Sequence, residues 1–294
     1  MLSLRGIDRS FGDRQVLHDV SFDVAPGRMT GFVGANGSGK TTTMRIILGV
    51  LAAQSGTVTV DGGPITAGYR SRIGYMPEER GLYPKMSVID QLVYLGELHG
   101  LSGATARARA LDLLERLGLG ERATDTVEAL SLGNQQRAQI AAALVHDPVA
   151  LILDEPFSGL DPMAVEMMLG VLRDVASSGA PVLFSSHQLD VVERLCDDLV
   201  IIADGRVRAS GSRAEIRAQH STPEWTLVSS ADVGWVRQMP GVDVVEFDGG
   251  HVRFAASDAD TADAVLRAAV ERGTVRSFGP SPRPLTEIFA EVIR

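Results

Sequence analysis

Residues 34–41 combine glycines, a lysine and a threonine at the spacing of a phosphate-binding loop, Gly-Ala-Asn-Gly-Ser-Gly-Lys-Thr. Glycines let backbone N–H groups curve around a phosphate with no Cβ in the way. Lys40 would reach the β- and γ-phosphates, and the Thr41 hydroxyl would bind Mg²⁺. An apolar run at 29–33 and an amphipathic stretch at 42–51 flank the loop, as this strand–loop–helix motif requires. The predicted phosphate contacts are Gly34, Ala35, Asn36, Gly37, Ser38, Gly39, Lys40, Thr41 and Thr42.

Two adjacent acids, Asp154 and Glu155, follow an apolar run that begins at Val149. An apolar run that ends in acids is typical of a buried parallel strand whose carboxyl end lies at a site. Adjacent acids after a strand usually belong to a solvated loop, but the phosphate loop in the same chain favours a nucleotide site. Asp154 would then hold Mg²⁺, and Glu155 would act as general base on the attacking water.

His187 follows a second apolar run, at 181–186. A lone histidine is more often structural than catalytic. A histidine at the end of a strand next to the one that carries Asp154 and Glu155 could, however, reach the γ-phosphate. We therefore predict Lys40, Glu155 and His187 as the catalytic residues.

Residues 130–137, Leu-Ser-Leu-Gly-Asn-Gln-Gln-Arg, resemble the signature motif of ATP-binding cassette (ABC) ATPases. The phosphate loop, Asp154-Glu155, the segment 158–161 and His187 occur in the order and spacing of that family across about residues 1–215. The resemblance implies that two copies pack head to tail and enclose two ATP molecules between them. Each ATP would touch one copy's phosphate loop and the other copy's signature.

The resemblance also implies roles for individual residues across that interface. Ser131, Gly133 and Asn134 of the signature would contact the γ-phosphate, and Asp161 would communicate with the opposite site. Phe11 lies where the family places an aromatic ring that stacks on adenine, although an ordinary core phenylalanine is the alternative.

Two positions depart from the family pattern. Glu78 replaces the usual glutamine after the strand at 72–77, where a carboxylate can still bind Mg²⁺ but adds negative charge near the phosphates. Leu-Ser-Leu-Gly-Asn replaces the usual Leu-Ser-Gly-Gly-Gln at the signature. Both departures resemble one subgroup, the ATPase subunits of bacterial sodium-extrusion (NatA-type) and drug or antibiotic exporters. The predicted Mg²⁺ ligands are thus Thr41, Glu78 and Asp154.

The subgroup implies a function and partners. We predict the ATP-hydrolysing subunit of an exporter, an ATPase that pairs with a second copy and drives a separate transmembrane permease from the cytoplasmic face of the membrane. The alternative is a soluble ABC ATPase that acts on ribosomes or DNA. A regulator that hydrolyses little ATP is a third reading, which Glu78 favours and Glu155 opposes.

Composition agrees with a peripheral role. The net charge of −9 argues against a nucleic-acid partner, and no apolar run reaches the ~20 residues of a membrane span. A single cysteine, Cys196, excludes an intrachain disulfide and favours the cytoplasm. Lys40 and Lys85 are the only lysines.

The elements that must position these residues indicate an α/β fold. We predict an ABC-type nucleotide-binding domain at 1–219, with a mixed sheet, a flanking antiparallel sheet and a helical subdomain at about 86–147. A predicted linker at 220–223 precedes a small α+β domain at 224–294. Its β-α-β-β-α-β pattern, with helices at 232–238 and 260–272, predicts a ferredoxin-like fold.

The loop at 80–86 carries Tyr83 and Lys85 and is the predicted docking surface for the permease. A surface loop without a partner is the alternative. The small domain lacks an obvious catalytic cluster, so we expect it to support dimerisation or regulation, or only to stabilise the chain.

Overall fold

The computed structural model describes residues 1–79, 81–220, 224–281 and 285–292. The chain divides into two compact units, Met1–Arg213 and Ala214–Val292. The predicted domain limits, 1–219 and 224–294, stay predictions. In the structure, most of the helix that spans the predicted boundary belongs to the second unit.

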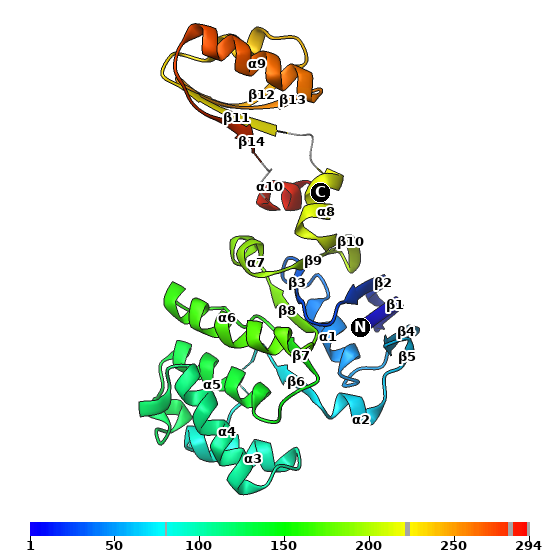
Figure 1. The fold of residues 1–294 in the computed structure, drawn as a ribbon. Helices are drawn as coiled ribbons and strands as arrows, with labels where there is room; N and C mark the ends of the chain where they lie inside the picture. Colours follow the sequence, from blue (N-terminus) through cyan, green and yellow to red (C-terminus); the bar gives the residue numbers. More distant parts are fainter. Residues whose placement is uncertain (80, 221–223, 282–284, 293–294) are drawn as a thin grey trace. The chain divides into compact units, whose positions relative to one another are not determined.

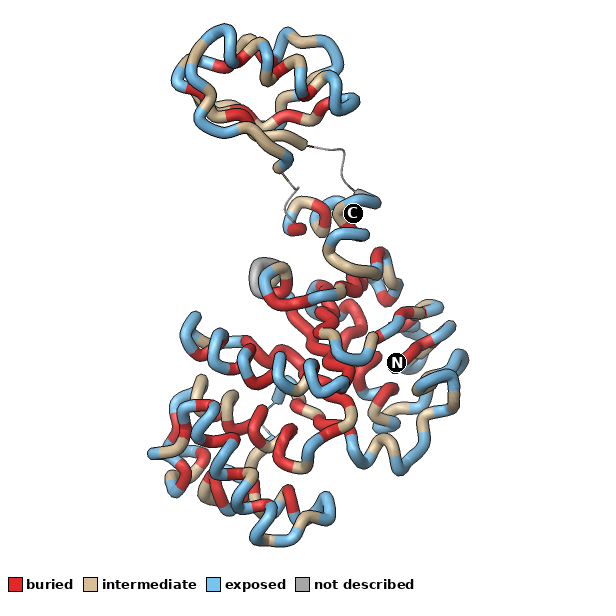
Figure 2. The backbone as a smooth tube through the Cα atoms, in the orientation of Figure 1, coloured by how far each residue is buried: buried red, intermediate tan, exposed pale blue. Residues whose placement is uncertain are grey.

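A six-stranded sheet occupies the first unit (Figure 1). Its strands are β3 (Met29–Val33), β6 (Ile73–Met76), β7 (Ala150–Leu153), β8 (Val182–Ser186), β9 (Asp198–Ala203) and β10 (Arg206–Ser212). The order is β10-β9-β3-β8-β7-β6, in which only the edge strand β10 is antiparallel to its neighbour. Strands β3, β7 and β8 are buried along their whole length (Figure 2), as apolar runs in a covered parallel sheet are.

A second, antiparallel sheet flanks the first. Its order is β2-β1-β4-β5, and its strands are β1 (Leu2–Phe11), β2 (Arg14–Val24), β4 (Ser55–Val60) and β5 (Gly63–Pro64). One apolar core joins both sheets to helix α1 (Lys40–Ile47): Leu4, Phe22, Phe32, Met44 and Ile152 belong to the same buried cluster. The predicted mixed sheet with a flanking antiparallel sheet is confirmed.

Helix α1 is shorter than predicted. We expected a helix at 42–51, but α1 ends at Ile47. Gly49 has a φ of 76°, and its N–H donates to the carbonyl oxygen of Ile46 at 3.0 Å. A glycine in the left-handed region ends the helix, and its N–H satisfies one of the free carbonyl groups at the helix C-terminus. The helix therefore stops here, although apolar residues follow.

The insertion between β6 and β7 forms the predicted helical subdomain (Figure 1). Ser87 caps its first helix, because its Oγ accepts a hydrogen bond from the Asp90 N–H at 3.2 Å. The elements are α3 (Val88–Leu98), α4 (Gly103–Arg116), the 3₁₀ turns η1 (Gly120–Arg122) and η2 (Val127–Ala129), and α5 (Leu132–Leu144). The remaining helices of this unit are α2 (Ala67–Arg70), α6 (Pro162–Ser177) and α7 (Leu189–Leu195).

The second unit contains a four-stranded antiparallel sheet with the order β12-β13-β11-β14. Its elements are α8 (Arg213–His220), β11 (Glu224–Ser229), η3 (Gly234–Gln238), β12 (Val242–Asp248), β13 (His251–Ala256), α9 (Ala259–Arg272), β14 (Val275–Pro280) and α10 (Leu285–Val292). Strand β13 lies between β11 and β12, and β11 lies between β13 and β14, which is the split arrangement predicted from the sequence. Helix α9 packs on β11, β13 and β14.

One predicted helix of this unit is wrong in type. Residues 232–238 were expected to form an α-helix, but only a 3₁₀ helix, η3, is present. The Asp232 carboxylate accepts a hydrogen bond from the Gly234 N–H at 2.7 Å, and Pro240 follows closely. A segment this short, between a local side-chain turn and a proline, cannot propagate an α-helix.

Residues 221–223 of the predicted linker lie outside the described residues. Across the described ranges, no helix combines the length and apolar character needed to traverse a bilayer.

Candidate nucleotide site

The phosphate loop joins the end of β3 to the start of α1, as predicted. Gly34 cannot carry a side chain, because a Cβ there would lie 2.5 Å from Ser38 Oγ and also meet Ile202. Gly37 and Gly39 have φ values of 80° and 108°, which glycine adopts at little cost. The loop backbone is thus left open for an anion at the N-terminus of α1.

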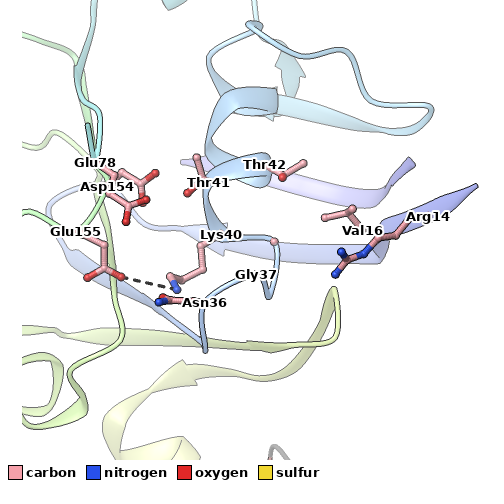
Figure 3. Close-up of a pocket in the computed structure, with 11 residues that line it drawn as sticks. Arg14, Val16, Asn36, Gly37, Lys40, Thr41, Thr42, Glu78, Asp154 and Glu155 are labelled. Carbon is pink, nitrogen blue, oxygen red and sulfur yellow. Dashed lines mark ion pairs between the residues drawn. The ribbon is translucent and has the colours of Figure 1, made fainter. Parts of the chain in front are cut away.

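Lys40 is held in the loop by backbone oxygens. Its Nζ donates to the carbonyl oxygens of Gly34 at 2.7 Å and Ala35 at 3.3 Å, and it lies 3.8 Å from Glu155 Oε1 (Figure 3). The lysine side chain is only 7% exposed. Its positive charge therefore lies inside the pocket, where it can meet phosphate oxygens.

The two acids follow β7, and their side chains are nearly buried. The Asp154 N–H donates to the Met76 carbonyl oxygen at 2.8 Å, and its Oδ1 accepts a hydrogen bond from Ser185 Oγ at 2.6 Å. Burial, together with the negative charge of Asp154, raises the pKa of Tyr75 on β6. The acidic pair is thus fixed by the two neighbouring strands, β6 and β8.

His187 meets Glu155 where β8 ends. Its Nδ1 lies 2.9 Å from Glu155 Oε2, and about half of the imidazole is exposed. Glu155 is therefore placed between an ammonium group and an imidazole, which joins the three predicted catalytic side chains into one chain of contacts.

A pocket of about 450 Å³ opens over these residues (Figure 3). Its lining includes most of the predicted phosphate and metal contacts, Asn36, Gly37, Gly39, Lys40, Thr41, Thr42, Glu78 and Asp154, together with the predicted base Glu155. Gly34 and Ala35 contribute by holding Lys40. Arg14 and Val16 also line the pocket and were not predicted. They come from β2, which no motif marks and which packs beside α1 in the fold.

Phe11 lies outside the lining of that pocket. Its ring is 47% exposed at the end of β1, with the guanidinium carbon of Arg9 4.8 Å from the ring centroid. It is therefore not a buried core phenylalanine, and its predicted stacking on adenine stays a prediction.

The signature residues do not line the pocket of Lys40. Ser131 caps α5 and is exposed, and Asn134 accepts a hydrogen bond from Arg137. Asp161 caps α6 through a 2.8 Å bond from the Ala164 N–H. A Cβ on Gly133 would lie 3.3 Å from Leu160, so the signature and the segment 158–161 lie together.

The predicted docking loop is described from residue 81 onward, and Arg80 lies outside the described residues. Tyr83 is 59% exposed and Lys85 is exposed. The Tyr83 N–H donates to Gln91 Oε1 at 2.6 Å, which ties this exposed loop to helix α3.

The sheet, the glycine-rich loop at the N-terminus of α1 and the two acids after β7 define a P-loop nucleotide-binding protein. Residues 17–158 match the family described as ABC transporter, and residues 211–293 match the family described as "ATP-binding protein DrrA1-3-like, C-terminal domain". The chain belongs to the ABC transporter ATP-binding proteins. It is an ATPase whose hydrolysis is coupled to transport, as the sequence predicts.

Relatives in two bacteria agree with this assignment. The ABC transporter ATP-binding protein YhaQ of Bacillus subtilis (strain 168) is 36% identical over 100% of this chain and 98% of its own length. The Nod factor export ATP-binding protein I of Ralstonia nicotianae is 34% identical over 98% of this chain and 92% of its own length. The linearmycin resistance ATP-binding protein LnrL of Bacillus subtilis is 36% identical over 74% of this chain and 70% of its own length.

Solved structures match about three quarters of the chain. An ATP-binding subunit of an ABC transporter is 34% identical with a TM-score of 0.69, over 74% of this chain and 92% of that one. The cbiO1 protein of Clostridium perfringens, part of the ABC transporter complex cbiONQ, is 28% identical with a TM-score of 0.66, over 74% of this chain and 90% of that one. These relatives are transport proteins, so the ribosome or DNA alternative is not supported.

Proposed function

We propose that this chain is the ATP-hydrolysing subunit of an exporter, which works as a pair of identical copies on a separate membrane permease. Export is supported by relatives named for linearmycin resistance and Nod factor export. A multi-subunit assembly is supported by the structural relative described as part of a transporter complex. The site would then lie at the cytoplasmic face of the membrane, with the loop that carries Tyr83 and Lys85 against the permease.

The observation that carries the proposal is that the signature and the phosphate loop do not share a pocket within one chain. Lys40 lines the nucleotide pocket, whereas Ser131, Gly133 and Asp161 lie outside its lining, with Ser131 and Asp161 on the surface. A helix N-terminus such as that of α5 binds anions well. A second copy, packed head to tail, would bring its Ser131 and Gly133 to the γ-phosphate.

Mg²⁺ is the metal that the oxygen donors fit. Asp154 Oδ2 is buried and makes no hydrogen bond with the described residues, while Thr41 and Glu78 line the same pocket. Searched over its described residues, the chain offers no cluster of three His, Cys, Asp or Glu side chains able to hold a metal. Mg²⁺ needs only a few ligands from the protein, because one or two carboxylates and the substrate phosphates usually hold it.

The residues of the pocket divide the work of hydrolysis. Lys40 and the loop N–H groups bind the phosphates, and bound Mg²⁺ would neutralise charge on the transferred phosphoryl group. Glu155 would accept a proton from the attacking water, and His187, which contacts Glu155 through Nδ1, would hold that carboxylate and could reach the γ-phosphate. Loss of the γ-phosphate would weaken the dimer, because both copies bind its charge.

The dimer is tested with Glu155→Gln in Mg²⁺ and ATP, where blocked hydrolysis should accumulate it. We expect light scattering to give twice the chain mass with ATP and the single-chain mass without it. The matched control is the double variant Glu155→Gln with Ser131→Arg, which should stay a single chain. A single-chain mass for Glu155→Gln in saturating ATP would contradict the paired site.

The permease is tested by capture. Glu155→Gln, tagged and expressed in its native cell, should be purified from detergent-solubilised membranes with a stoichiometric multi-span membrane protein. A variant with Tyr83→Ala and Lys85→Ala is the control, and it should lose that protein while still binding ATP. Recovery of ribosomes or DNA, or of no membrane protein, would contradict the exporter.

A further inference from the structure

The backbone of Glu155 has a conformation that needs outside support. Its φ is 51°, in the left-handed region that side-chain-bearing residues rarely adopt. Strain of this kind persists at sites where the surrounding structure holds it. Two polar side chains from other elements bind the backbone of Glu155, one at its N–H group and one at its carbonyl oxygen.

Ser185 on β8 binds the N–H side. The Glu155 N–H donates to Ser185 Oγ at 2.8 Å, and the same hydroxyl donates to Asp154 Oδ1 at 2.6 Å. Ser185 is fully buried. One hydroxyl group therefore fixes the Glu155 backbone and aims the carboxylate of its neighbour.

Gln136 on α5 binds the carbonyl side. Its Nε2 donates to the carbonyl oxygens of Glu155 at 3.1 Å and Pro156 at 3.0 Å. The first turn of α5 is the signature segment, capped by Ser131. The amide therefore ties the helix that carries the signature to the peptide that carries Glu155 in the same chain.

We propose that Ser185 and Gln136 are positioning residues for Glu155. The two residues hold the left-handed backbone of Glu155. In that conformation Glu155 Oε1 lies 3.8 Å from Lys40 Nζ, and Oε2 lies 2.9 Å from His187 Nδ1. Gln136 also makes the orientation of Glu155 depend on the position of α5. The inference rests on the proposed role of Glu155 as general base.

The first test replaces Gln136 with leucine, which keeps the volume of the side chain and removes its donor. Small misplacements of a reacting group lower rates by up to about 10²-fold. We expect kcat to fall about 10- to 100-fold, with ATP affinity, measured by a fluorescent ATP analogue, within twofold of the parent. Gln136→Glu, which also lacks the donor, should not restore kcat.

Gln91→Leu is the matched control. Gln91 is buried on α3, its Oε1 accepts a hydrogen bond from the Tyr83 N–H at 2.6 Å, and it lies outside the signature segment and the nucleotide pocket. We expect a similar drop in melting temperature and a kcat within threefold of the parent. Equal losses of kcat in the two variants would overturn the role of Gln136.

A double-mutant cycle separates positioning from general damage. In a Glu155→Gln background, Gln136→Leu should lower the residual rate less than twofold, because the group that it positions is already gone. A fall as large as in the parent would overturn the proposal. If Glu155→Gln alone keeps the parent rate, Glu155 is not the general base. The single variant shows this independently of the effect of Gln136→Leu.

Ser185 is tested without nucleotide or metal. In Ser185→Ala the Glu155 amide proton should exchange with solvent at least tenfold faster than in the parent, because its acceptor is lost. Ser185→Thr, which keeps the hydroxyl, should restore slow exchange. Unchanged exchange in Ser185→Ala would overturn the role of Ser185.

Discussion

The ammonium group of Lys40 lies 3.8 Å from Oε1 of Glu155, and both side chains are more than nine-tenths buried. Each charge thus compensates the other inside the pocket, in addition to the backbone oxygens that hold the lysine. Removing one partner of a buried pair leaves an uncompensated charge, which is costly.

Lys40→Met should therefore have two effects. The free energy of unfolding should fall by about 3 kcal/mol, because Glu155 loses its nearest cation. Affinity for ATP should fall at least tenfold, because the phosphates lose a charged hydrogen bond of roughly 1.5–3 kcal/mol. Urea unfolding and nucleotide titration measure the two. Lys85→Met, at the other lysine, should change neither quantity, and a similar loss there would refute the assignment.

Gly34 and Gly37 should differ in their tolerance of alanine. Gly34→Ala drives a Cβ against Ser38 and Ile202, so we expect at least about 2 kcal/mol of destabilisation and loss of ATP binding. Gly37→Ala meets nothing within 4 Å and pays only for its φ of 80°, about 1–2 kcal/mol. Thermal unfolding and ATP titration of both variants check this order, and equal effects would contradict it.

His146 should make stability depend on pH. Burial, with a smaller contribution from the stacked ring of His99, lowers the pKa of His146 to about 4. An unfolded chain binds a proton to this residue near pH 6.5, so the folded state loses stability as the pH falls from 6.5 toward 4.

His146→Gln should remove this dependence. Partial exposure of the imidazole reduces the effect, and we expect the parent to lose on the order of 1 kcal/mol more than the variant between pH 7 and pH 5. Urea unfolding at the two pH values measures the difference. His18, on β2, serves as the control in His18→Gln. Parallel losses in parent and His146→Gln would disprove the assignment.

Cys196 should resist alkylation. Its thiol is 1% exposed, donates to the Val192 carbonyl oxygen at 2.9 Å, and has a pKa raised mainly by burial. Since the thiolate is the nucleophile, iodoacetamide should modify the folded protein at least 100-fold more slowly than the protein in urea, even at pH 9. Mass spectrometry measures one adduct at most, because the chain has one cysteine. Rapid labelling of the folded protein would contradict the packing.

Arg253 should stabilise the second unit. Its guanidinium contacts Glu224 at 3.2 Å and Glu287 at 3.0 Å, and the side chains of Arg253 and Glu224 are 15% and 8% exposed. Arg253→Met leaves the Glu224 carboxylate buried without its cation, so we expect a loss of about 3 kcal/mol.

Tryptophan fluorescence during urea unfolding measures this loss, because both tryptophans of the chain, Trp225 and Trp235, lie in the second unit. The control is Arg276→Met, at an exposed position of β14. A midpoint for Arg253→Met that equals that of the control would contradict the prediction.

The chemistry of the site could be predicted because its main residues lie in short, contiguous segments of the sequence. The phosphate loop needs particular residues at fixed positions, and the acids follow directly after a buried strand, so neighbours in sequence are neighbours in space. Arg14 and Val16 could not be found in this way, because β2 carries no motif and only the tertiary packing of β2 beside α1 brings them to the pocket. Ser185 and Gln136 were missed for the same reason, since each binds Glu155 from a different element.

Most secondary-structure elements could also be predicted, and one could not. Alternation and helical spacing predict most of the strands and the long helices, including the hairpin of β12 and β13, because burial of one face requires that spacing. The segment at 232–238 has the spacing of a helix but too few residues for one, and the Asp232 side chain offers its backbone another partner. Local competition of this kind is not visible in a pattern of apolar residues.

The strand order has a consequence for how the protein is made. β3, which carries the phosphate loop, ends at Val33, yet its two sheet neighbours are β8, which ends at Ser186, and β9, which ends at Ala203. At ~5–20 residues per second, a ribosome needs on the order of 10–30 s to supply the first of them. For that time a strand that is buried along its whole length in the folded protein has no sheet partner, so we expect the nascent chain to rely on chaperones until its eighth strand emerges.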